Sequence, residues 1–387
     1  MPPSQTASGP LCRVHVWVPE LISKRGGIQT FSRCLVAALT EILGRNNVQV
    51  MAKNDSDLDL KSEQIVALSR GWGSWHSGLR TFVFFSGIIW SAIRLRPQIV
   101  IATHLNFGLA GYVLKRLTGI RYWCVAHGIE AWNLNRPAAR FGLLRADLIL
   151  AVSNYTRQRL LTEQSLNPER IVILPNTIDR ESMWARPKPA HLMRRHALTV
   201  RNKIVLTVAR LAEPERYKGY DQILRALPAI KKKIPDVRYV LVGEGGDRAR
   251  IEGLIRQLDL CGAVVLAGAV PAKELADYYN ICDVFAMPSK GEGFGIVYLE
   301  ALACGKPVLA GNSDGSSEPL QNGKVGVLVD ADDVDGIASS LTNILDGTYP
   351  LDALYSPERL REESLREFGF DVFKERLSSL LEANAKS

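Results

Sequence analysis

The chain has 387 residues, 47% of them hydrophobic and 23% charged, which is the composition of an ordinary soluble globular protein. Its length exceeds what one core normally supports and predicts two domains of about 180 residues each. The net charge of +8 resides in the first half, because residues 1–180 hold 21 lysines and arginines against 11 aspartates and glutamates.

This basic first half predicts contact with something anionic. Nucleic acid fits poorly, because the sequence shows no helix-turn-helix pattern, zinc-ligand spacing or RNA-binding aromatic strand. An anionic membrane surface or a phosphate-bearing acceptor fits better. A basic face that is merely solvated remains the alternative.

The six cysteines are scattered and form no C-x-x-C pair. Buried reduced thiols in a reducing cytoplasm explain them better than disulfides or a metal site. The N-terminal sequence lacks a charged region followed by an apolar core, so no signal peptide is predicted. The longest apolar run, 81–93, is predicted to be too short to cross a bilayer.

Short apolar runs alternate with helical stretches along the first half, a pattern typical of doubly wound α/β domains. Because parallel strands are buried on both faces, they read as nearly continuous apolar runs. The predicted strands are 13–18, 48–52, 64–68, 98–102, 121–126, 147–152 and 170–174, and the predicted helices are 28–43, 77–95, 108–118 and 154–165. The polar stretch 180–202 is predicted to be the interdomain linker.

Two polar or aromatic segments of the first half allow more than one interpretation. Asp55, Asp57 and Asp59 have the D-x-D spacing of a metal site, but the run 53–63 lacks a buried strand, so a solvated loop is predicted. The segment 79–96 carries aromatic residues and flanking arginines. It is predicted to form a helix that either docks on a membrane surface or packs into the core, and we favour a mixture of the two.

The alternation of strands and helices resumes in the second half of the chain. The predicted strands there are 203–209, 238–243, 263–268, 283–288, 307–311 and 326–330. The turn that begins at Gly243 does not match a dinucleotide-binding fingerprint, because the next strand ends without an acidic residue. Residues 370–385 have the spacing of an amphipathic helix.

The most informative segment follows the strand at 283–288. A glycine-rich turn opens a helix that is apolar almost all round, with one carboxylate, Glu300, in its middle. A buried carboxylate needs a partner, and the hydroxyl groups of a ligand would serve. The glycines allow backbone N–H groups to approach an anion at the positive end of the helix. An anion at the turn and a polyol at the carboxylates together describe a sugar nucleotide.

Glu292 and Glu300 lie within the sequence E-G-F-G-I-V-Y-L-E-A-L-A-C-G-K-P-V. This segment resembles the E-x7-E signature of the retaining glycosyltransferases of family 4, which have the GT-B fold. The resemblance implies two Rossmann-like, doubly wound domains facing each other across a deep cleft. It implies an acceptor-binding domain at 1–185, a nucleotide-sugar-binding domain at 186–367, and a last helix, 368–387, that packs back on the first domain. The alternative is a buried helix whose Glu300 pairs with Lys306 or an arginine.

The resemblance also implies roles for residues of the second domain. Arg210 and Lys218, which match the family's R-x(n)-K-G element, would clamp the diphosphate of the donor. Glu292 would hold the transferred hexose, and Glu300 would hold the ribose hydroxyls. Further donor contacts are implied for Gly243, Glu244, Val270, Gly293, Phe294, Gly295 and Ile296.

In the first domain, the diglycine Gly26-Gly27 resembles the family loop that brings backbone amides to the donor phosphate and the acceptor. His127 matches the family's H-G position beside the transferred sugar, and we favour a sugar contact over a general base. Asn154 and Asn176, at the ends of two further strands, are predicted to line the cleft. Arg210, Lys218, Glu292 and His127 are the residues to which the resemblance assigns catalytic roles.

The expected protein is a metal-independent, retaining hexosyltransferase without a cofactor. Its donor would be a UDP- or GDP-sugar, and its acceptor a hydroxyl group on a lipid-linked or polysaccharide glycan. It is expected in the cytoplasm, with peripheral contact to the inner face of the cytoplasmic membrane and no nucleic-acid partner. The alternatives are a retaining phosphorylase or nucleotide-sugar hydrolase on the same fold, or a nucleotide-sugar-binding protein without turnover.

Overall fold

The computed structural model describes residues 13–23, 26–62, 68–132, 134–178 and 183–386. Contacts divide the chain into two compact units, Met1–Pro175 with Phe373–Ser387, and Asn176–Val372. The domain boundaries predicted from the sequence lie after residues 185 and 367.

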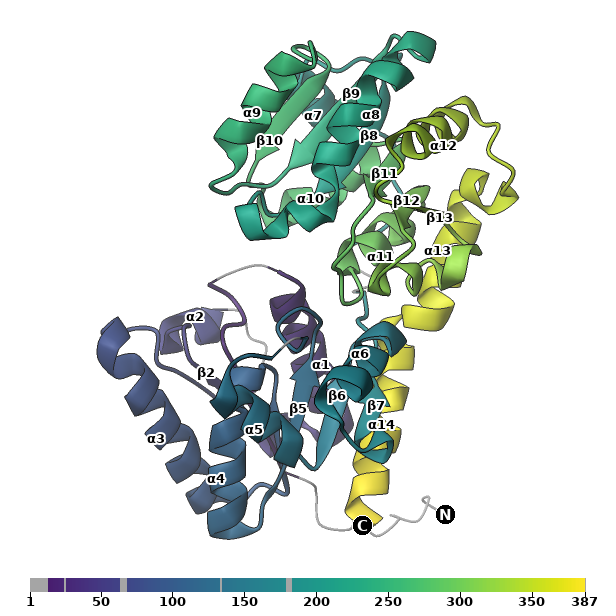
Figure 1. Ribbon diagram of the computed structural model, residues 1–387. Coiled ribbons are helices and arrows are strands. Elements are labelled where there is room, and N and C mark those ends of the chain that lie inside the picture. The colour runs from purple at the N-terminus through teal and green to yellow at the C-terminus, as the bar shows by residue number, and fades with distance from the viewer. Residues whose placement is uncertain (1–12, 24–25, 63–67, 133, 179–182, 387) are drawn as a thin grey trace, which may run out of the picture. The chain divides into compact units, whose positions relative to one another are not determined.

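The first unit is built on a parallel sheet of seven strands in the order β3-β2-β1-β4-β5-β6-β7. Figure 1 labels β2, β5, β6 and β7 of this sheet. The strands are β1 (Val14–Val18), β2 (Val48–Ala52), β3 (Leu68–Gly71), β4 (Ile99–Ala102), β5 (Arg121–Ala126), β6 (Leu148–Ala151) and β7 (Ile171–Ile173). The inner strands are almost entirely buried, which explains their continuous apolar sequences.

The helices of the first unit connect these strands and cover the sheet. They are α1 (Gly27–Leu43), α2 (Asp57–Ser62), α3 (Ser77–Leu95), α4 (Gly108–Thr118), α5 (Pro137–Arg145) and α6 (Asn154–Gln164). The core beneath α3 and α4 contains Trp17, Trp72, Phe84 and Ile88. The ring of Trp72 packs edge-on against Phe84, with ring centroids 5.2 Å apart.

The second unit repeats the architecture with a six-stranded parallel sheet in the order β10-β9-β8-β11-β12-β13. Its strands are β8 (Lys203–Val208), β9 (Val237–Val242), β10 (Val264–Gly268), β11 (Val284–Met287), β12 (Val308–Gly311) and β13 (Val327–Val329). Its α-helices are α7 (Ala190–Arg195), α8 (Tyr220–Lys233), α9 (Arg248–Gln257), α10 (Ala272–Ile281), α11 (Ile296–Ala303), α12 (Val334–Asp346) and α13 (Pro357–Phe368).

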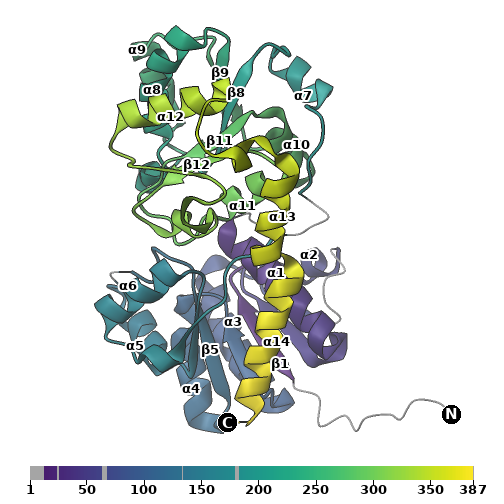
Figure 2. The same ribbon diagram turned by 90° about the vertical axis from the view of Figure 1, so that its right-hand side faces the viewer.

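The last helix, α14 (Phe370–Lys386), contributes Phe373 and the residues after it to the first unit. Its apolar side chains at Phe373, Leu377 and Leu381 are buried. The ring of Phe373 meets that of Phe31 of α1 edge-on, at 5.7 Å between centroids, and Lys374 pairs with Glu41 at 2.7 Å. Helix α14 runs alongside α1 (Figure 2). The amphipathic spacing thus corresponds to a helix with one buried face.

Most predicted strands are confirmed to within one residue at each end, and those at 48–52 and 121–126 coincide with β2 and β5. The strand predicted at 64–68 differs, because β3 runs from Leu68 to Gly71 and residues 63–67 lie outside the described residues. Helix α7, within the predicted linker, was not anticipated, and its Leu192 and Met193 are buried in the second unit.

The prediction of a solvated loop at the three aspartates is wrong. Asp57 begins helix α2, and Asp55 is fully buried. The carboxylate of Asp55 accepts backbone N–H groups of Leu21, at 2.5 Å, and Ser23, at 2.9 Å. A charged side chain is tolerated inside the protein here because the main chain supplies its hydrogen-bond donors.

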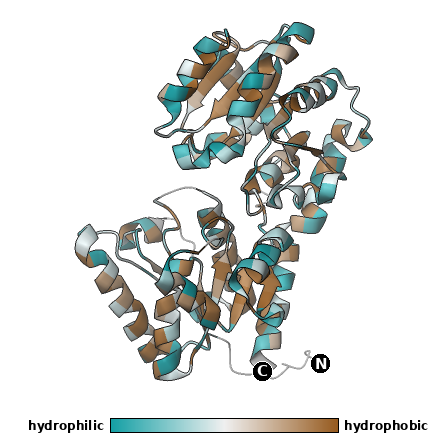
Figure 3. Cartoon of the chain, in the orientation of Figure 1, coloured by the Kyte–Doolittle hydropathy of each residue, from teal (hydrophilic) through white to brown (hydrophobic). Residues whose placement is uncertain are grey.

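The apolar run 81–93 belongs to a longer helix, α3. Among the described residues, α3 is the one helix whose length and composition would allow it to cross a membrane. Core helices of soluble proteins meet the same criterion. Phe84, Ile88 and Ala92 of α3 are buried in the first unit, while hydrophobic residues also occupy other positions along the helix (Figure 3).

The described cysteines show no disulfide. Cys34, Cys124, Cys282 and Cys304 are buried free thiols, and Cys261 is exposed. Burial raises the pKa of the Cys124 thiol to about 12, so that thiol is protonated and unreactive. Cys12 lies outside the described residues.

Candidate functional site

The strand order of the second unit reverses between β8 and β11, because β9 follows on one side and β12 on the other. Loops that leave the carboxyl ends of two such strands diverge, and ligands of open α/β sheets bind in the crevice between them. The loop 209–219 follows β8 and the loop 288–295 follows β11. These two loops carry Arg210, Lys218 and Glu292.

Four charged side chains meet in these loops. The ammonium group of Lys218 donates to Oε1 of Glu292 at 2.5 Å. Nε of Arg210 lies 2.7 Å from Oε1 of Glu215, and the other oxygen of Glu215 lies 3.8 Å from Nζ of Lys218. We call these four residues the ion cluster. The structure thus brings together three predicted site residues and adds Glu215, which the sequence analysis did not assign.

Lys218 stays charged although its side chain is only 16% exposed. Loss of hydration by itself lowers the pKa of Lys218, but Glu292, Tyr217 and Glu215 outweigh this effect and hold the pKa above its ordinary value. The side chain of Arg210 is 73% exposed. The site therefore offers one partly buried cation and one accessible cation, a combination suited to two linked phosphates.

Close backbone contacts fix the segment that presents Lys218. Gly219 has a φ of +84°, and a Cβ atom there would lie 2.2 Å from the carbonyl oxygen of Pro288. The N–H of Lys290 donates to the carbonyl of Tyr217 at 2.9 Å. Because only glycine fits this conformation and this space, the K-G dipeptide places Lys218 against the loop after β11.

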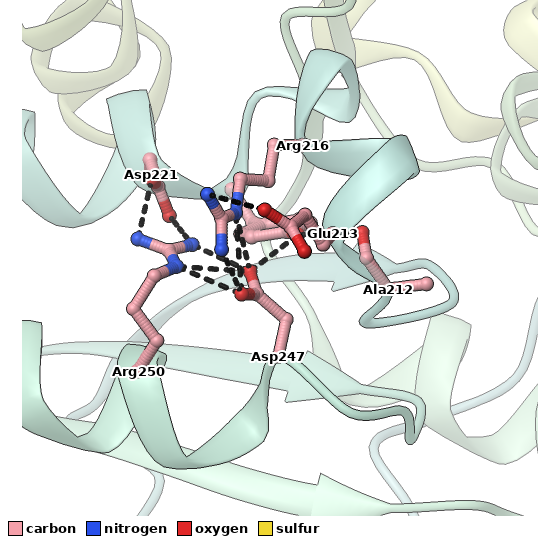
Figure 4. Close-up of polar contacts among 7 residues, drawn as sticks. Ala212, Glu213, Arg216, Asp221, Asp247 and Arg250 are labelled. Atoms are coloured by element: carbon pink, nitrogen blue, oxygen red, sulfur yellow. Dashed lines mark hydrogen bonds and ion pairs between the residues drawn. The ribbon is translucent and has the colours of Figure 1, made fainter.

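The loop from Arg210 to Lys218 contains a 3-10 helix, η4 (Glu213–Lys218), which is anchored through Arg216 (Figure 4). The guanidinium of Arg216 donates to Asp247 at 2.6 Å, and that of Arg250 donates to Asp247 at 2.6 Å and to Asp221 at 2.8 Å. These two guanidinium groups hold the pKa of Asp247 well below its usual range. The middle of the loop is therefore fixed to the start of helix α9.

The turn after β9 packs against the same loop. Gly243 has a φ of +137°, and a Cβ atom there would lie 1.8 Å from the carbonyl oxygen of Ala209. The carbonyl of Glu244 accepts the N–H of Leu211 at 2.9 Å, and the Glu244 side chain is exposed. Val270, in contrast, follows the edge strand β10 and is partly buried.

Asp314 supports Glu292 from the loop after β12. This carboxylate is 2% exposed and accepts the backbone N–H of Glu292 at 2.7 Å and the hydroxyl of Ser289 at 2.7 Å. It also accepts the N–H of Ser316 at 3.0 Å. Burial raises the pKa of Asp314, and these hydrogen bonds oppose the rise. The sequence analysis missed Asp314, although its place after an apolar strand is where such residues occur.

The glycine-rich turn leads directly into α11. Gly295 caps the helix with a φ of +83°, where a Cβ atom would lie 2.3 Å from the ring of Tyr298. Phe294 is 1% exposed and its ring meets Phe368 at 5.4 Å, so a ligand could contact Phe294 only through its backbone. Ile296 is buried as the first residue of α11, and Gly293 is also buried.

Glu300 is 9% exposed and accepts the hydroxyl of Tyr279 at 2.6 Å. Lys306, the alternative partner considered above, donates to the carbonyl of Asn280 at 3.0 Å. The helix around Glu300 is buried as predicted, with Val297 its partly exposed member. Tyr279 gives the carboxylate the partner that its burial requires.

In the first unit, His127 follows β5. Its ring Nε2 lies 2.9 Å from the carbonyl oxygen of Thr103, which can only accept, so this nitrogen carries the proton. Its backbone N–H donates to Glu130 at 2.5 Å, and Phe31 packs edge-on at 5.1 Å. Burial lowers the pKa of His127 to about 4, so the ring is neutral at pH 7. A neutral ring that is protonated on Nε2 leaves Nδ1 as its hydrogen-bond acceptor.

The diglycine stands where the chain enters α1. Gly26 is the N-terminal cap and Gly27 the first residue of the helix, and both are exposed. The segment Leu21–Ser23, which precedes them, donates its backbone N–H groups to the carboxylate of Asp55. Just ahead of that segment, the buried Glu20 accepts the side-chain amides of Gln29, at 2.8 Å, and Asn54, at 2.5 Å.

The two predicted asparagines differ in their surroundings. Asn154 is exposed at the start of α6, where Ser153 caps the helix by accepting the N–H of Thr156 at 2.9 Å. Asn176 belongs to the second unit, although it was predicted in the first domain. It is 7% exposed, and its Oδ1 has no hydrogen-bond partner among the described residues.

Comparison with known proteins assigns the sequence to a family. The family model described as Glycosyltransferase Family 4 matches residues 25–182, and the one described as Glycosyl transferases group 1 matches residues 191–363.

Two curated relatives are similar to much of the chain. The chain is 34% identical over 250 residues to the GDP-mannose-dependent alpha-(1-6)-phosphatidylinositol monomannoside mannosyltransferase of Mycolicibacterium smegmatis. This match covers 61% of this chain and 64% of the relative. It is 30% identical over 296 residues to the D-inositol 3-phosphate glycosyltransferase of Thermobispora bispora. This match covers 70% of this chain and 68% of the relative. The chain thus spans less than two thirds of the length of the first relative.

Among solved structures, Anabaena Alr3699/HepE in complex with UDP and glucose is similar with a TM-score of 0.80. The match covers 96% of this chain and 100% of that chain at 19% identity. At this level of identity the similarity establishes a shared fold.

Proposed function

Because the chain belongs to the group 1 glycosyltransferases of family 4 and has their GT-B fold, we propose that it is a retaining hexosyltransferase. The donor is a nucleoside-diphosphate sugar with uracil or guanine as its base. The acceptor is a hydroxyl group on a lipid-linked or polysaccharide glycan. The observation that carries this proposal is the ion cluster at the switch point of the second sheet, where Arg210 and Lys218 face one crevice.

In the proposed reaction, the ion cluster stabilises the nucleoside diphosphate as it leaves the sugar. The acceptor oxygen forms a bond to the anomeric carbon as the bond from that carbon to the diphosphate breaks. The acceptor proton passes to an oxygen of the departing diphosphate, on the same face of the sugar. Lys218 is held in place before the reaction begins, and Arg210 can reach the diphosphate from its exposed position, so both can stabilise the growing negative charge.

The remaining roles are proposed from the family resemblance, and the contacts of each group are consistent with them. Glu292 binds hexose hydroxyls while its backbone is held by Asp314. Glu300 binds the ribose, with Tyr279 supporting its carboxylate. In the first unit, the neutral His127 accepts a hydrogen bond from the sugar through Nδ1 rather than acting as a base.

The names of the relatives favour particular donors for the first test. One relative is named for GDP-mannose, and the structural neighbour is a complex with UDP and glucose. We would therefore screen GDP-mannose and UDP-glucose by thermal shift, since a bound donor stabilises the folded state by mass action. The proposal is wrong if no nucleotide sugar raises the unfolding temperature or is turned over.

The products of the same assay separate the alternatives. A transferase releases nucleoside diphosphate in proportion to the glycosylated acceptor. Free sugar would identify a hydrolase, and sugar 1-phosphate a phosphorylase. Binding without release of any product would identify a protein that does not turn over its ligand.

We further propose that no metal is required, because Arg210 and Lys218 supply the positive charge that a divalent cation supplies in other transferases. Treatment with EDTA is expected to leave the rate of sugar transfer essentially unchanged. The measurement is initial rate with and without chelator. A loss of activity that added magnesium or manganese restores would contradict this.

Helices α3 and α4 suggest how a lipid-linked acceptor is reached. Exposed apolar side chains gather on these neighbouring helices, namely Leu79, Phe82, Trp90, Ile93, Leu109, Val113 and Leu117. The guanidinium of Arg94 lies 5.5 Å from the ring of Trp90, and the side chain of Arg80 donates to the carbonyl of Trp75. We propose that this face binds an anionic bilayer, because arginines beside exposed aromatic side chains suit the boundary between headgroups and acyl chains.

Binding to anionic liposomes is therefore expected to be salt-sensitive and to weaken when Arg80, Arg94 and Arg96 are all replaced by Gln. Co-flotation measures the bound fraction. The matched control replaces the exposed lysines Lys231, Lys232 and Lys233 of the second unit, which removes the same charge elsewhere. Equal loss in both triple variants, or no flotation at low salt, would contradict membrane docking by α3.

A further inference from the structure

Glu215 occupies an unusual position for a residue outside the family motif. Its two carboxylate oxygens reach the two cations that the proposed function assigns to the diphosphate, with Oε1 2.7 Å from Arg210 and Oε2 3.8 Å from Lys218. The carboxylate thus spans both cations, as an oxyanion of a bound diphosphate would.

The charges of the ion cluster are balanced without a ligand, since two cations face two carboxylates. A diphosphate that entered this site would add negative charge to a balanced cluster, and the withdrawal of one carboxylate would reduce the resulting repulsion. Glu292 is the less mobile of the two. It contacts Lys218 at 2.5 Å, and its backbone N–H is held by the buried Asp314.

Glu215 is the carboxylate that can withdraw. Its contact with Lys218 is long, and its stronger partner, Arg210, has a side chain that is 73% exposed and can turn with the incoming ligand. The backbone of η4 is fixed next to it by the pairing of Arg216 with Asp247. The Glu215 side chain is itself 16% exposed, so its displacement requires a rotation of the side chain together with that of Arg210, while the backbone of the loop stays in place.

We propose that Glu215 is a built-in anion that occupies the diphosphate position of the donor site and is displaced when the donor binds. This inference rests on the proposed function, because it concerns the same site. It assigns to Glu215 a role in the exchange of ligands: the carboxylate competes with the diphosphate of the donor, and it returns to Arg210 when the nucleoside diphosphate leaves. No covalent bond changes in this exchange.

Glu215→Gln keeps the shape of the side chain and removes its charge, so it tests this competition directly. Isothermal calorimetry would measure the binding of inorganic pyrophosphate, UDP and GDP to the wild type and the variant. We expect the variant to bind pyrophosphate and the preferred nucleoside diphosphate roughly tenfold more tightly. Binding of the corresponding nucleoside, which has no phosphate, should not change.

The matched control is Glu213→Gln. Glu213 lies on the same 3-10 helix, its side chain is 80% exposed, and its ion-pair partner is Arg216, at 3.8 Å. The control removes the same charge outside the ion cluster, and it should leave pyrophosphate affinity within about twofold of the wild type, as expected for an exposed charge.

Weaker or unchanged binding of pyrophosphate and nucleoside diphosphate by Glu215→Gln would overturn the inference, since it would mean that Glu215 positions Arg210 for the ligand or plays no part. That result would leave the proposed function standing, because the wild type would still bind nucleoside diphosphate. Absence of binding by the wild type and both variants would instead overturn the proposed function together with the inference.

Discussion

Lys218→Ala is expected to lower kcat by roughly a hundredfold or more, because one lost charge contact to a developing leaving-group charge costs on the order of 2–4 kcal/mol. Lys218 is partly buried and held charged by the surrounding carboxylates. Its removal takes away a cation and leaves the carboxylate of Glu292 close to the diphosphate without its partner. The loss should appear in kcat more than in donor KM, since the diphosphate is most negative in the transition state.

The control for this substitution is Lys290→Ala. Lys290 is the nearby lysine of the loop after β11, and its side chain pairs with the exposed Asp332. Its contact with η4 runs through the backbone N–H, which the substitution keeps. Thermal unfolding of both variants would show whether each remains folded. A folded Lys218→Ala protein with nearly normal kcat would remove Lys218 from the reaction.

Glu300→Gln is expected to raise the dissociation constants of the donor and of free nucleoside diphosphate alike, roughly tenfold, with little change in kcat. The amide keeps the size of the side chain and an oxygen that can still accept from Tyr279. It loses the negative charge that strengthens hydrogen bonds to ribose hydroxyls. Titration with nucleoside diphosphate and steady-state kinetics would measure the two effects.

Tyr279→Phe is the control that distinguishes a lost ribose contact from a disturbed hydrogen bond in the core as the cause of weaker nucleotide binding. This variant removes the hydroxyl that donates to Glu300 but leaves the carboxylate in place. If it weakens nucleotide binding as much as Glu300→Gln does, the effect comes from the core hydrogen bond. Unchanged nucleoside diphosphate binding by Glu300→Gln would show that α11 does not carry the ribose site.

The architecture was predictable because parallel strands are buried on both faces. The runs 48–52 and 121–126 are apolar for this reason, and their bounds agree with β2 and β5. The meeting of Arg210, Lys218 and Glu292 followed from their places after strands and from the family resemblance. Whether each of these residues has the role assigned to it stays a prediction.

What the sequence could not show depends on tertiary hydrogen bonds. Asp55 lies in a polar run, yet it is buried because three residues from another loop present their N–H groups to it. Asp314 likewise accepts hydrogen bonds from Ser289 and Glu292, which are distant in the sequence. Glu215 reaches Arg210 because the loop that carries both residues turns back on itself. A run of charged residues in a sequence predicts exposure to solvent. Only the folded structure shows which carboxylates are buried and accept hydrogen bonds from N–H or O–H groups inside the protein.

Helix α14 has a consequence for how the chain is made. The strands of the first unit leave the ribosome before the second unit, but Phe373, Leu377 and Leu381, which are buried on the first unit, emerge after the second unit. The second unit consists of one continuous stretch, Asn176–Val372, and is fully synthesised before them. During translation the unit that begins first is therefore the last to be completed, and until then the ring of Phe31 lacks its neighbour on α14.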